Sequence, residues 1–93
     1  SEKELAFYDA VTAFPDVKAA MEEKILMDLV KELTEIIKRS ATIDWSERAQ
    51  TRARMRVEIR RLLKKYDYPP DKTEGAVEQV VKQAEKMAMG IIS

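Results

Sequence analysis

Arginine and lysine are concentrated in one segment of this chain, between Ser46 and Tyr66. The segment contains eight basic and two acidic residues, a local charge of +6 in a 93-residue chain whose net charge is zero. Arginine binds phosphate or carboxylate groups through two parallel N–H donors, so the chemistry available to this segment is anion binding. Its basic residues are Arg48, Arg52, Arg54, Arg56, Arg60, Arg61, Lys64 and Lys65.

Three interpretations of these eight cations are open. They pair with acids of neighbouring helices or are solvated, they form a surface that docks a protein partner, or they contact DNA and release its counterions. The acidic remainder of the chain would repel DNA. Arg54, Arg61 and Lys65 also lie away from the row that repeats at every fourth residue, so the charge is not one stripe. That row consists of Arg48, Arg52, Arg56 and Arg60.

Several other kinds of chemistry are not indicated by these residues. The chain has no cysteine and no histidine, which removes disulfides, thiolate metal sites and the most common general base. It has no glycine-rich phosphate loop and no carboxylate cluster with metal-ligand spacing. No apolar run approaches the roughly 20 residues of a membrane span, and no signal peptide is recognisable. We therefore expect no catalytic, cofactor-binding or metal-binding residue and no membrane partner.

Residues at the two ends of the basic segment are expected to be structural anchors. Trp45 directly precedes Ser46, a good helix N-cap, and should fix how the chain enters the helix. Asp44 is expected to bond to backbone or to pair with an arginine. Tyr66 and Tyr68 could stack on nucleic-acid bases, but packing of the loop onto the helices explains them better. The anchors at the far end are Tyr66, Tyr68, Pro69, Pro70 and Asp71.

Helical periodicity predicts helices over residues 2–14, 16–39, 46–66 and 72–89, with a possible break near 21–23. Pro15 should end the first helix, and Asp71 with Glu74 has the spacing of a helix cap. Four to five amphipathic helices with short connections must bury their apolar stripes against one another, which predicts an all-α bundle. The expected core positions are Leu5, Tyr8, Val11 or Thr12, Ile25 or Leu26, Leu29, Leu33, Ile36, Ile37, Ala49, Ala53, Met55 or Arg56, Ile59, Leu62, Leu63, Tyr66, Val77, Val80, Val81, Ala84, Met87 and Ala88.

The sequence from Ile43 onward resembles the C-terminal helical region of the R (motor) subunit of type I restriction–modification enzymes. In that family the run reads approximately I-D-W, then R-A-R-x-R in an arginine-rich helix, then R-x-L-L-x-K-Y-G-Y-P-P-D-K. The N-terminal ELAFYDAV also resembles the start of the family's region. The matching residues are Ile43, Asp44, Trp45, Arg52, Ala53, Arg54, Arg56, Arg61, Leu62, Leu63, Lys65, Tyr66, Tyr68, Pro69, Pro70, Asp71 and Lys72.

The chain departs from the family pattern at two places. Asp67 stands where the family usually has glycine, which we expect to adopt the left-handed conformation after the helix. Aspartate tolerates that conformation better than most other residues, so the loop should keep its shape. Glu22 and Glu23 replace a Gly-Asp pair that often interrupts the second helix in relatives.

The resemblance implies that the parent subunit is an ATP- and Mg²⁺-dependent DNA translocase and endonuclease of the prokaryotic cytoplasm. It implies assembly with methyltransferase and specificity subunits, and contact with DNA through that complex. The chain, which starts with Ser1, is then expected to be a single helical domain excised from the C-terminal end. It would dock the motor subunit on the methyltransferase core, or alternatively guide duplex DNA along helix 46–66. The isolated fragment could also self-associate.

Overall fold

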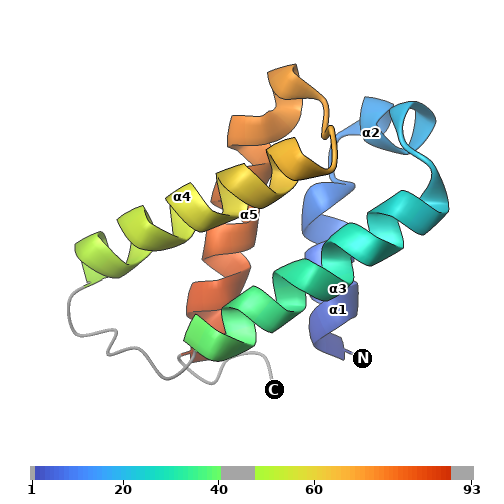
Figure 1. Cartoon of the computed structure of the whole chain (residues 1–93). Coiled ribbons are helices and arrows are strands. Elements are labelled where there is room, and N and C mark those ends of the chain that lie inside the picture. Colours follow the sequence, from blue (N-terminus) through green and yellow to red (C-terminus); the bar gives the residue numbers. More distant parts are fainter. Residues whose placement is uncertain (1, 41–47, 89–93) are drawn as a thin grey trace.

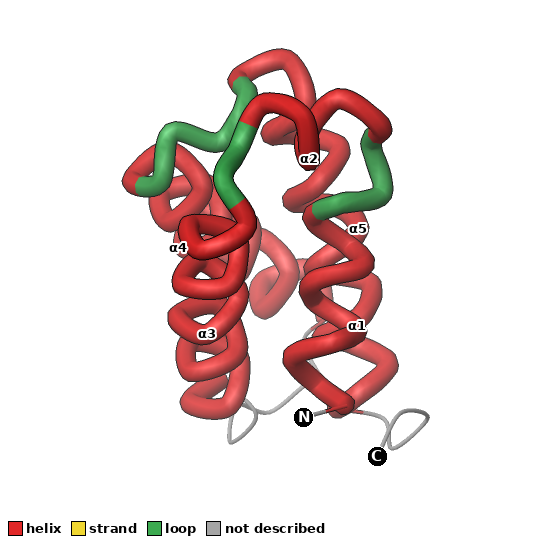
Figure 2. The backbone as a smooth tube through the Cα atoms, turned by 90° about the vertical axis from the view of Figure 1, so that its right-hand side faces the viewer, coloured by secondary structure: helices red, strands yellow, loops and turns green. Residues whose placement is uncertain are grey.

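The expected all-α architecture is confirmed in the computed structural model, which describes residues 2–40 and 48–88. Those residues form five helices and no strand (Figures 1 and 2). The helices are α1 (Glu2–Val11), α2 (Pro15–Ala20), α3 (Glu23–Ser40), α4 (Arg48–Lys65) and α5 (Pro70–Ala88). α1 packs against α3 and α5, while α4 packs against α5 and α3. The short α2 lies at the end of the bundle away from the start of α1 (Figure 2).

The predicted second helix is two helices, and the break suspected near 21–23 is confirmed. Met21 has extended backbone angles, φ −125° and ψ 140°, and its side chain is buried. Its N–H still donates to the Val17 carbonyl at 3.0 Å, which completes the last turn of α2. A buried methionine at the corner therefore anchors the change of direction between α2 and α3.

Two predicted helix boundaries were wrong, both beside prolines. α1 ends at Val11, three residues before the expected position 14, because Phe14 precedes Pro15 and is extended, with φ −98° and ψ 125°. Pro15 then begins α2, where its missing N–H costs nothing. α5 begins at Pro70 for the same reason, not at 72, and Asp71 lies inside its first turn.

The core confirms most of the predicted stripes. Val11, Leu26, Leu29, Leu33, Ile59, Leu63, Val77 and Val80 are fully buried, and so is Phe7, which lies outside the stripe predicted for its helix. Leu5 was wrongly assigned to the core, because its side chain is 59% exposed. Ile25, Ala49, Ala53 and Ala88 are also exposed. On α4 the inward face instead runs through Thr51 and Met55, one turn apart, which leaves the two alanines outside.

The end of α4 has the hydrogen bonds of a Schellman motif. The Tyr68 N–H donates to the Leu63 carbonyl at 3.0 Å, and the Asp67 N–H donates to the Lys64 carbonyl at 3.1 Å. Asp67 adopts φ 55°, the left-handed conformation expected at this position. The side chains of Leu63 and Tyr68 are both buried, which supplies the apolar contact that accompanies this motif.

Replacing Asp67 should change stability in a direction set by its positive φ. Glycine relieves the steric cost of the left-handed conformation, but it also gives the unfolded chain more conformational freedom, which offsets part of the gain. We therefore expect Asp67→Gly to raise the free energy of unfolding by about 0.5 kcal/mol. Asp67→Ala should lower the free energy of unfolding by about 1 kcal/mol. Urea unfolding of the two variants measures both effects. If Asp67→Ala were as stable as the native chain, strain at this position would not limit stability.

Candidate functional site

Three arginines of α4 form bidentate ion pairs with three glutamates of α5. Arg52 Nε and Nη2 donate to Glu85 at 3.0 and 2.6 Å. Arg56 makes the same pair with Glu78 at 2.7 and 3.2 Å. Arg60 completes the row with Glu74 at 2.6 and 2.8 Å. We call these three pairs the arginine–glutamate ladder.

The ladder follows from the antiparallel packing of α4 on α5. As the α4 number rises from Arg52 to Arg60, the α5 partner falls from Glu85 to Glu74. The arginines are four residues apart, and Glu74, Glu78 and Glu85 are spaced by four and then seven residues, so each set lies on one helix face. The spacing of these glutamates was the feature of the sequence from which the row of ion pairs could have been predicted.

A fourth ion pair joins α4 to α3. Lys65 Nζ lies 3.0 and 3.3 Å from the two carboxylate oxygens of Glu32. The Tyr66 hydroxyl donates to the same carboxylate at 2.9 Å. The Tyr66 side chain therefore links the end of α4 to α3.

These contacts perturb the pKa values of the groups involved. The hydrogen bond from Arg60 lowers the pKa of Glu74, and the bond from Arg56 lowers that of Glu78, both from an ordinary value of 4.5. Lys65, and then Tyr66, lower the pKa of Glu32. Ion pairing in turn raises the pKa of Arg52, chiefly through its bond to Glu85.

The ladder predicts loss of stability in acid. Because the folded pKa of Glu78 lies below its unfolded value, its stabilisation is present above about pH 4.5 and lost as pH falls through the folded pKa. Arg56→Gln removes the partner of Glu78, so its deficit in melting temperature should shrink between about pH 7 and pH 3. Arg54→Gln is the matched control, with the same charge change and no ion pair among the described residues. An Arg56→Gln deficit that is the same at both pH values would contradict this prediction.

The remaining cations of the predicted surface are outside these pairs. Arg54, Arg61 and Lys64 are exposed and form no ion pair within residues 2–40 and 48–88. For Arg48 the backbone alone is described. Internal pairing, the first of the three interpretations, thus describes Arg52, Arg56, Arg60 and Lys65. A role for the set as a partner or DNA surface stays a prediction.

The other predicted anchors fall into two groups. Tyr68 is 2% exposed, and its hydroxyl donates to the Val11 carbonyl at 2.6 Å. Pro69 accepts hydrogen bonds from Lys72 and Thr73 through its carbonyl, which starts α5 together with Pro70. Asp44 and Trp45 lie outside the described residues.

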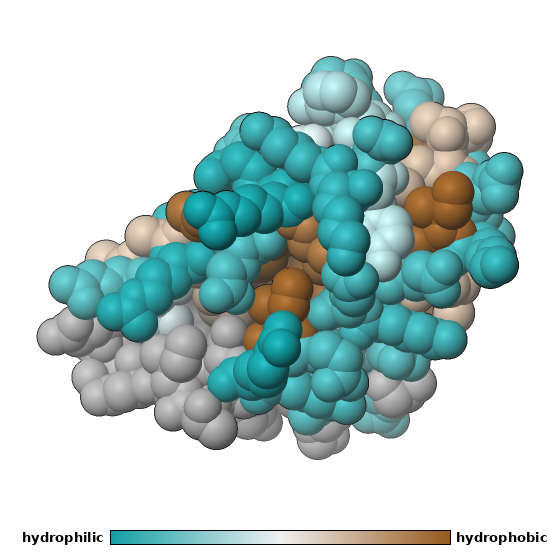
Figure 3. All heavy atoms as spheres, in the orientation of Figure 1, coloured by the Kyte–Doolittle hydropathy of each residue, from teal (hydrophilic) through white to brown (hydrophobic). Residues whose placement is uncertain are grey.

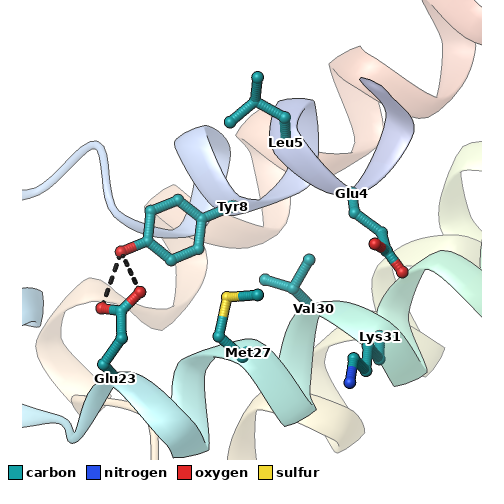
Figure 4. A pocket seen from close by; sticks show the side chains of 7 residues that line it. All are labelled: Glu4, Leu5, Tyr8, Glu23, Met27, Val30 and Lys31. Atoms are coloured by element: carbon teal, nitrogen blue, oxygen red, sulfur yellow. Dashed lines mark hydrogen bonds between the residues drawn. The ribbon is translucent and has the colours of Figure 1, made fainter. Parts of the chain in front are cut away.

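A groove between α1 and α3 was not expected from the sequence. It has a volume of about 340 Å³, and its lining residues are Glu4, Leu5, Tyr8, Glu23, Met27, Val30 and Lys31 (Figure 4). The Tyr8 hydroxyl donates to both carboxylate oxygens of Glu23 at 2.9 Å. Leu5 and Met27 are 59% and 41% exposed, so apolar surface on both helices faces solvent. Leu5, misassigned to the core, is one of the exposed side chains that line this groove.

The described part of the chain contains no group of three or more acidic residues arranged to hold a metal ion. Within the same residues, no helix combines the length and apolarity needed to cross a membrane. The described residues form a small all-α fold in which ion pairs join α4 to α5 and to α3.

The chain belongs to the family of C-terminal regions of the type I restriction enzyme HindI endonuclease subunit and similar proteins, whose model matches residues 1–90. It is 48% identical over 88 residues to the type I restriction enzyme HindI endonuclease subunit of Haemophilus influenzae. The match covers 95% of this chain but only 8% of that relative. No solved structure matches the chain. The resemblance recognised in the motifs from Ile43 to Lys72 is thereby confirmed.

Proposed function

We propose that the domain is a non-catalytic assembly module of a type I restriction endonuclease R subunit, and that it docks the motor subunit on the methyltransferase core. Family membership supports the setting in a restriction endonuclease subunit. Bond breaking, ATP and Mg²⁺ then belong to other parts of a much longer parent polypeptide. The partners are the methyltransferase and specificity subunits, and DNA is reached through the complex.

The observation that carries this proposal is the division of the cations of α4 into two sets. The ladder directs Arg52, Arg56 and Arg60 at α5, so they stiffen the domain. The outward face of α4 presents Arg54, Arg61 and Lys64, with Val57 between them and 43% exposed. These positions share one helix face. A large apolar side chain among cations suits a protein interface, because phosphate contacts gain nothing from it.

Deletion of the domain from the parent subunit tests this proposal. A subunit without these residues should bind the methyltransferase–specificity complex at least about tenfold more weakly, because the docking surface is gone. Mass photometry across a dilution series measures the assembly. The shortened subunit should keep its ATPase activity, which controls for misfolding. Assembly of the shortened subunit at unchanged affinity would overturn the proposal.

Binding of duplex DNA by the 93-residue chain tests the alternative role. The proposal predicts no binding in the micromolar range, because three arginines of α4 are held in ion pairs. A gel shift across a salt series measures this. Micromolar binding that falls steeply with salt would replace the assembly role with DNA guidance.

A further inference from the structure

The α1–α3 groove brings together exposed apolar side chains from two helices. Among the described residues the exposed large apolar side chains are Leu5, Ile25, Met27 and Val57. Two of them line this groove, Leu5 from α1 and Met27 from α3, together with the almost fully buried Val30 (Figure 4). On the face of the molecule drawn in Figure 3, by contrast, hydrophilic side chains cover most of the surface. Apolar side chains that gather in a groove on a mainly hydrophilic surface indicate a place where another segment binds.

The charged groups around the groove are balanced, so they do not select a charged ligand. Glu23 accepts hydrogen bonds from the Tyr8 hydroxyl, and Lys18 Nζ lies 5.4 Å from the centre of the Tyr8 ring. Glu4 and Lys31 add one charge of each sign to the lining, and Glu4 already has an interaction within the protein. Apolar side chains therefore fit this groove better than phosphates or a strongly charged peptide.

The position of the groove on α1 places it beside the point where a longer polypeptide would enter the domain. In the relative from Haemophilus influenzae the matched segment is 8% of the polypeptide, and the matching family model describes a C-terminal region, so most of that subunit precedes the segment. A parent with the same plan leads into this domain through the start of α1. Glu4 and Leu5, which line the groove, lie in the first turn of that helix. The preceding polypeptide therefore arrives within about one helical turn of the groove.

The small size of the groove also favours a segment of the same polypeptide. A stable interface between separate proteins buries at least about 1,000 Å² and uses about 20 residues or more on each side. Only seven residues line this groove. A segment joined to α1 by a short linker needs a much weaker contact, because the linker holds it at an effective concentration in the millimolar range.

We propose that the α1–α3 groove binds apolar side chains of the polypeptide that precedes residue 1 in the parent R subunit, an inference that rests on the setting proposed above. Those side chains pack on Leu5, Met27 and Val30. The domain then has two separate binding surfaces on different helices. The groove joins it to the rest of its own subunit, and the outward face of α4 stays open for the methyltransferase core.

Oxidation by hydrogen peroxide, followed by mass spectrometry, tests the groove through its own methionine. Met27 is 41% exposed, whereas Met21 and Met55 are 9% and 2% exposed and serve as buried references. In the 93-residue chain Met27 should be oxidised at least about tenfold faster than either reference, because oxidation follows exposure. In the parent subunit without its partners, oxidation of Met27 should be at least about fivefold slower than in the 93-residue chain.

The Val57→Met variant provides a matched probe on the outward face of α4, because Val57 is 43% exposed. In the parent subunit alone this probe should be oxidised within about twofold of its rate in the 93-residue chain. It should be protected only after the methyltransferase–specificity complex is added. The two methionines therefore report separately on contacts within the subunit and contacts between subunits.

Two glutamine substitutions test whether the apolar wall of the groove causes the protection. Leu5→Gln should reduce the protection of Met27 in the parent from about fivefold to less than about twofold. Ile25→Gln is the matched control, because Ile25 is also exposed and lies outside the groove, so protection should be unchanged. Neither variant should lower the melting temperature of the 93-residue chain by more than about 4 °C, since both side chains are exposed.

Four results would overturn the inference. Met27 could be oxidised equally fast in the parent and in the 93-residue chain, or Leu5→Gln could leave its protection unchanged. Protection that appears only after the partner complex is added would assign the groove to that complex. Protection that disappears when the parent subunit is diluted would assign it to a second copy.

The same measurements separate failure of this inference from failure of the assembly role. If the parent protects Met27 but the partner complex never protects the Val57→Met probe, the groove inference stands and docking through the outward face of α4 fails. If the complex protects that probe while Met27 stays reactive in the parent, the groove inference fails and the assembly role stands.

Discussion

Replacing Tyr68 with phenylalanine is expected to lower the free energy of unfolding by about 1–2 kcal/mol, and replacing it with alanine by roughly 3–5 kcal/mol. The hydroxyl donates to the Val11 carbonyl at 2.6 Å, and the side chain is 2% exposed. In an uninterrupted helix the Val11 carbonyl would accept from the N–H four residues later, but that residue is Pro15, which has none. Tyr68, 57 residues away, supplies the missing donor.

Urea unfolding followed by circular dichroism measures this loss. Tyr66→Phe is the matched control, because its hydroxyl bonds to the exposed carboxylate of Glu32 and water can replace it. Burial also raises the pKa of Tyr68 to about 12, so its stabilisation should persist at neutral pH and decrease as pH rises from about 10 toward 12. Equal stability of Tyr68→Phe and the native chain would show that the Val11 carbonyl finds another donor.

The second large effect is expected at Gly75. Replacing Gly75 with alanine should destabilise the native chain but stabilise a chain in which Phe14 is also replaced by alanine. A Cβ at Gly75 would lie 2.7 Å from Cζ of Phe14, closer than such atoms approach in proteins. Crowding against the ring should cost about 1–3 kcal/mol and outweigh the gain of about 1 kcal/mol in helix propensity. Gly75→Ala should therefore destabilise the native chain by roughly 1 kcal/mol.

In a Phe14→Ala background the ring is absent and the propensity term remains. Gly75→Ala should then stabilise the chain by about 1 kcal/mol, a coupling of roughly 2 kcal/mol between the two positions. Four urea curves, for the native chain, the two single variants and the double variant, close the cycle. Additive effects would mean that Phe14 moves aside without cost.

The sequence was sufficient to predict the structure correctly wherever a single strong local preference determined it. The stripe of Leu26, Leu29 and Leu33 has one helical interpretation, and the structure buries all three. Asp67 was placed in the left-handed region from the family's glycine, and its φ of 55° agrees. Pro15 was correctly read as a boundary, but a proline does not specify how many residues the turn before it needs.

Where several partners compete, sequence periodicity could not choose among them. In α1 the apolar residues Leu5, Phe7, Tyr8 and Val11 spread over nearly half of the helix circumference, so which of them are buried depends on how α3 and α5 pack. The partners of the α4 arginines were equally undetermined, because exposed ion pairs contribute little and leave no apolar pattern. The α1–α3 groove exists only in the packed bundle.

The arginine–glutamate ladder has a consequence for the newly made chain. Synthesis proceeds from the N-terminus, so α4 leaves the ribosome before α5 supplies Glu74, Glu78 and Glu85. During that interval Arg52, Arg56 and Arg60 lack their acidic partners and lie close to ribosomal RNA. Arrival of α5 pairs these three arginines, so a polypeptide truncated before Pro70 would expose three more unpaired cations to RNA than the finished domain does.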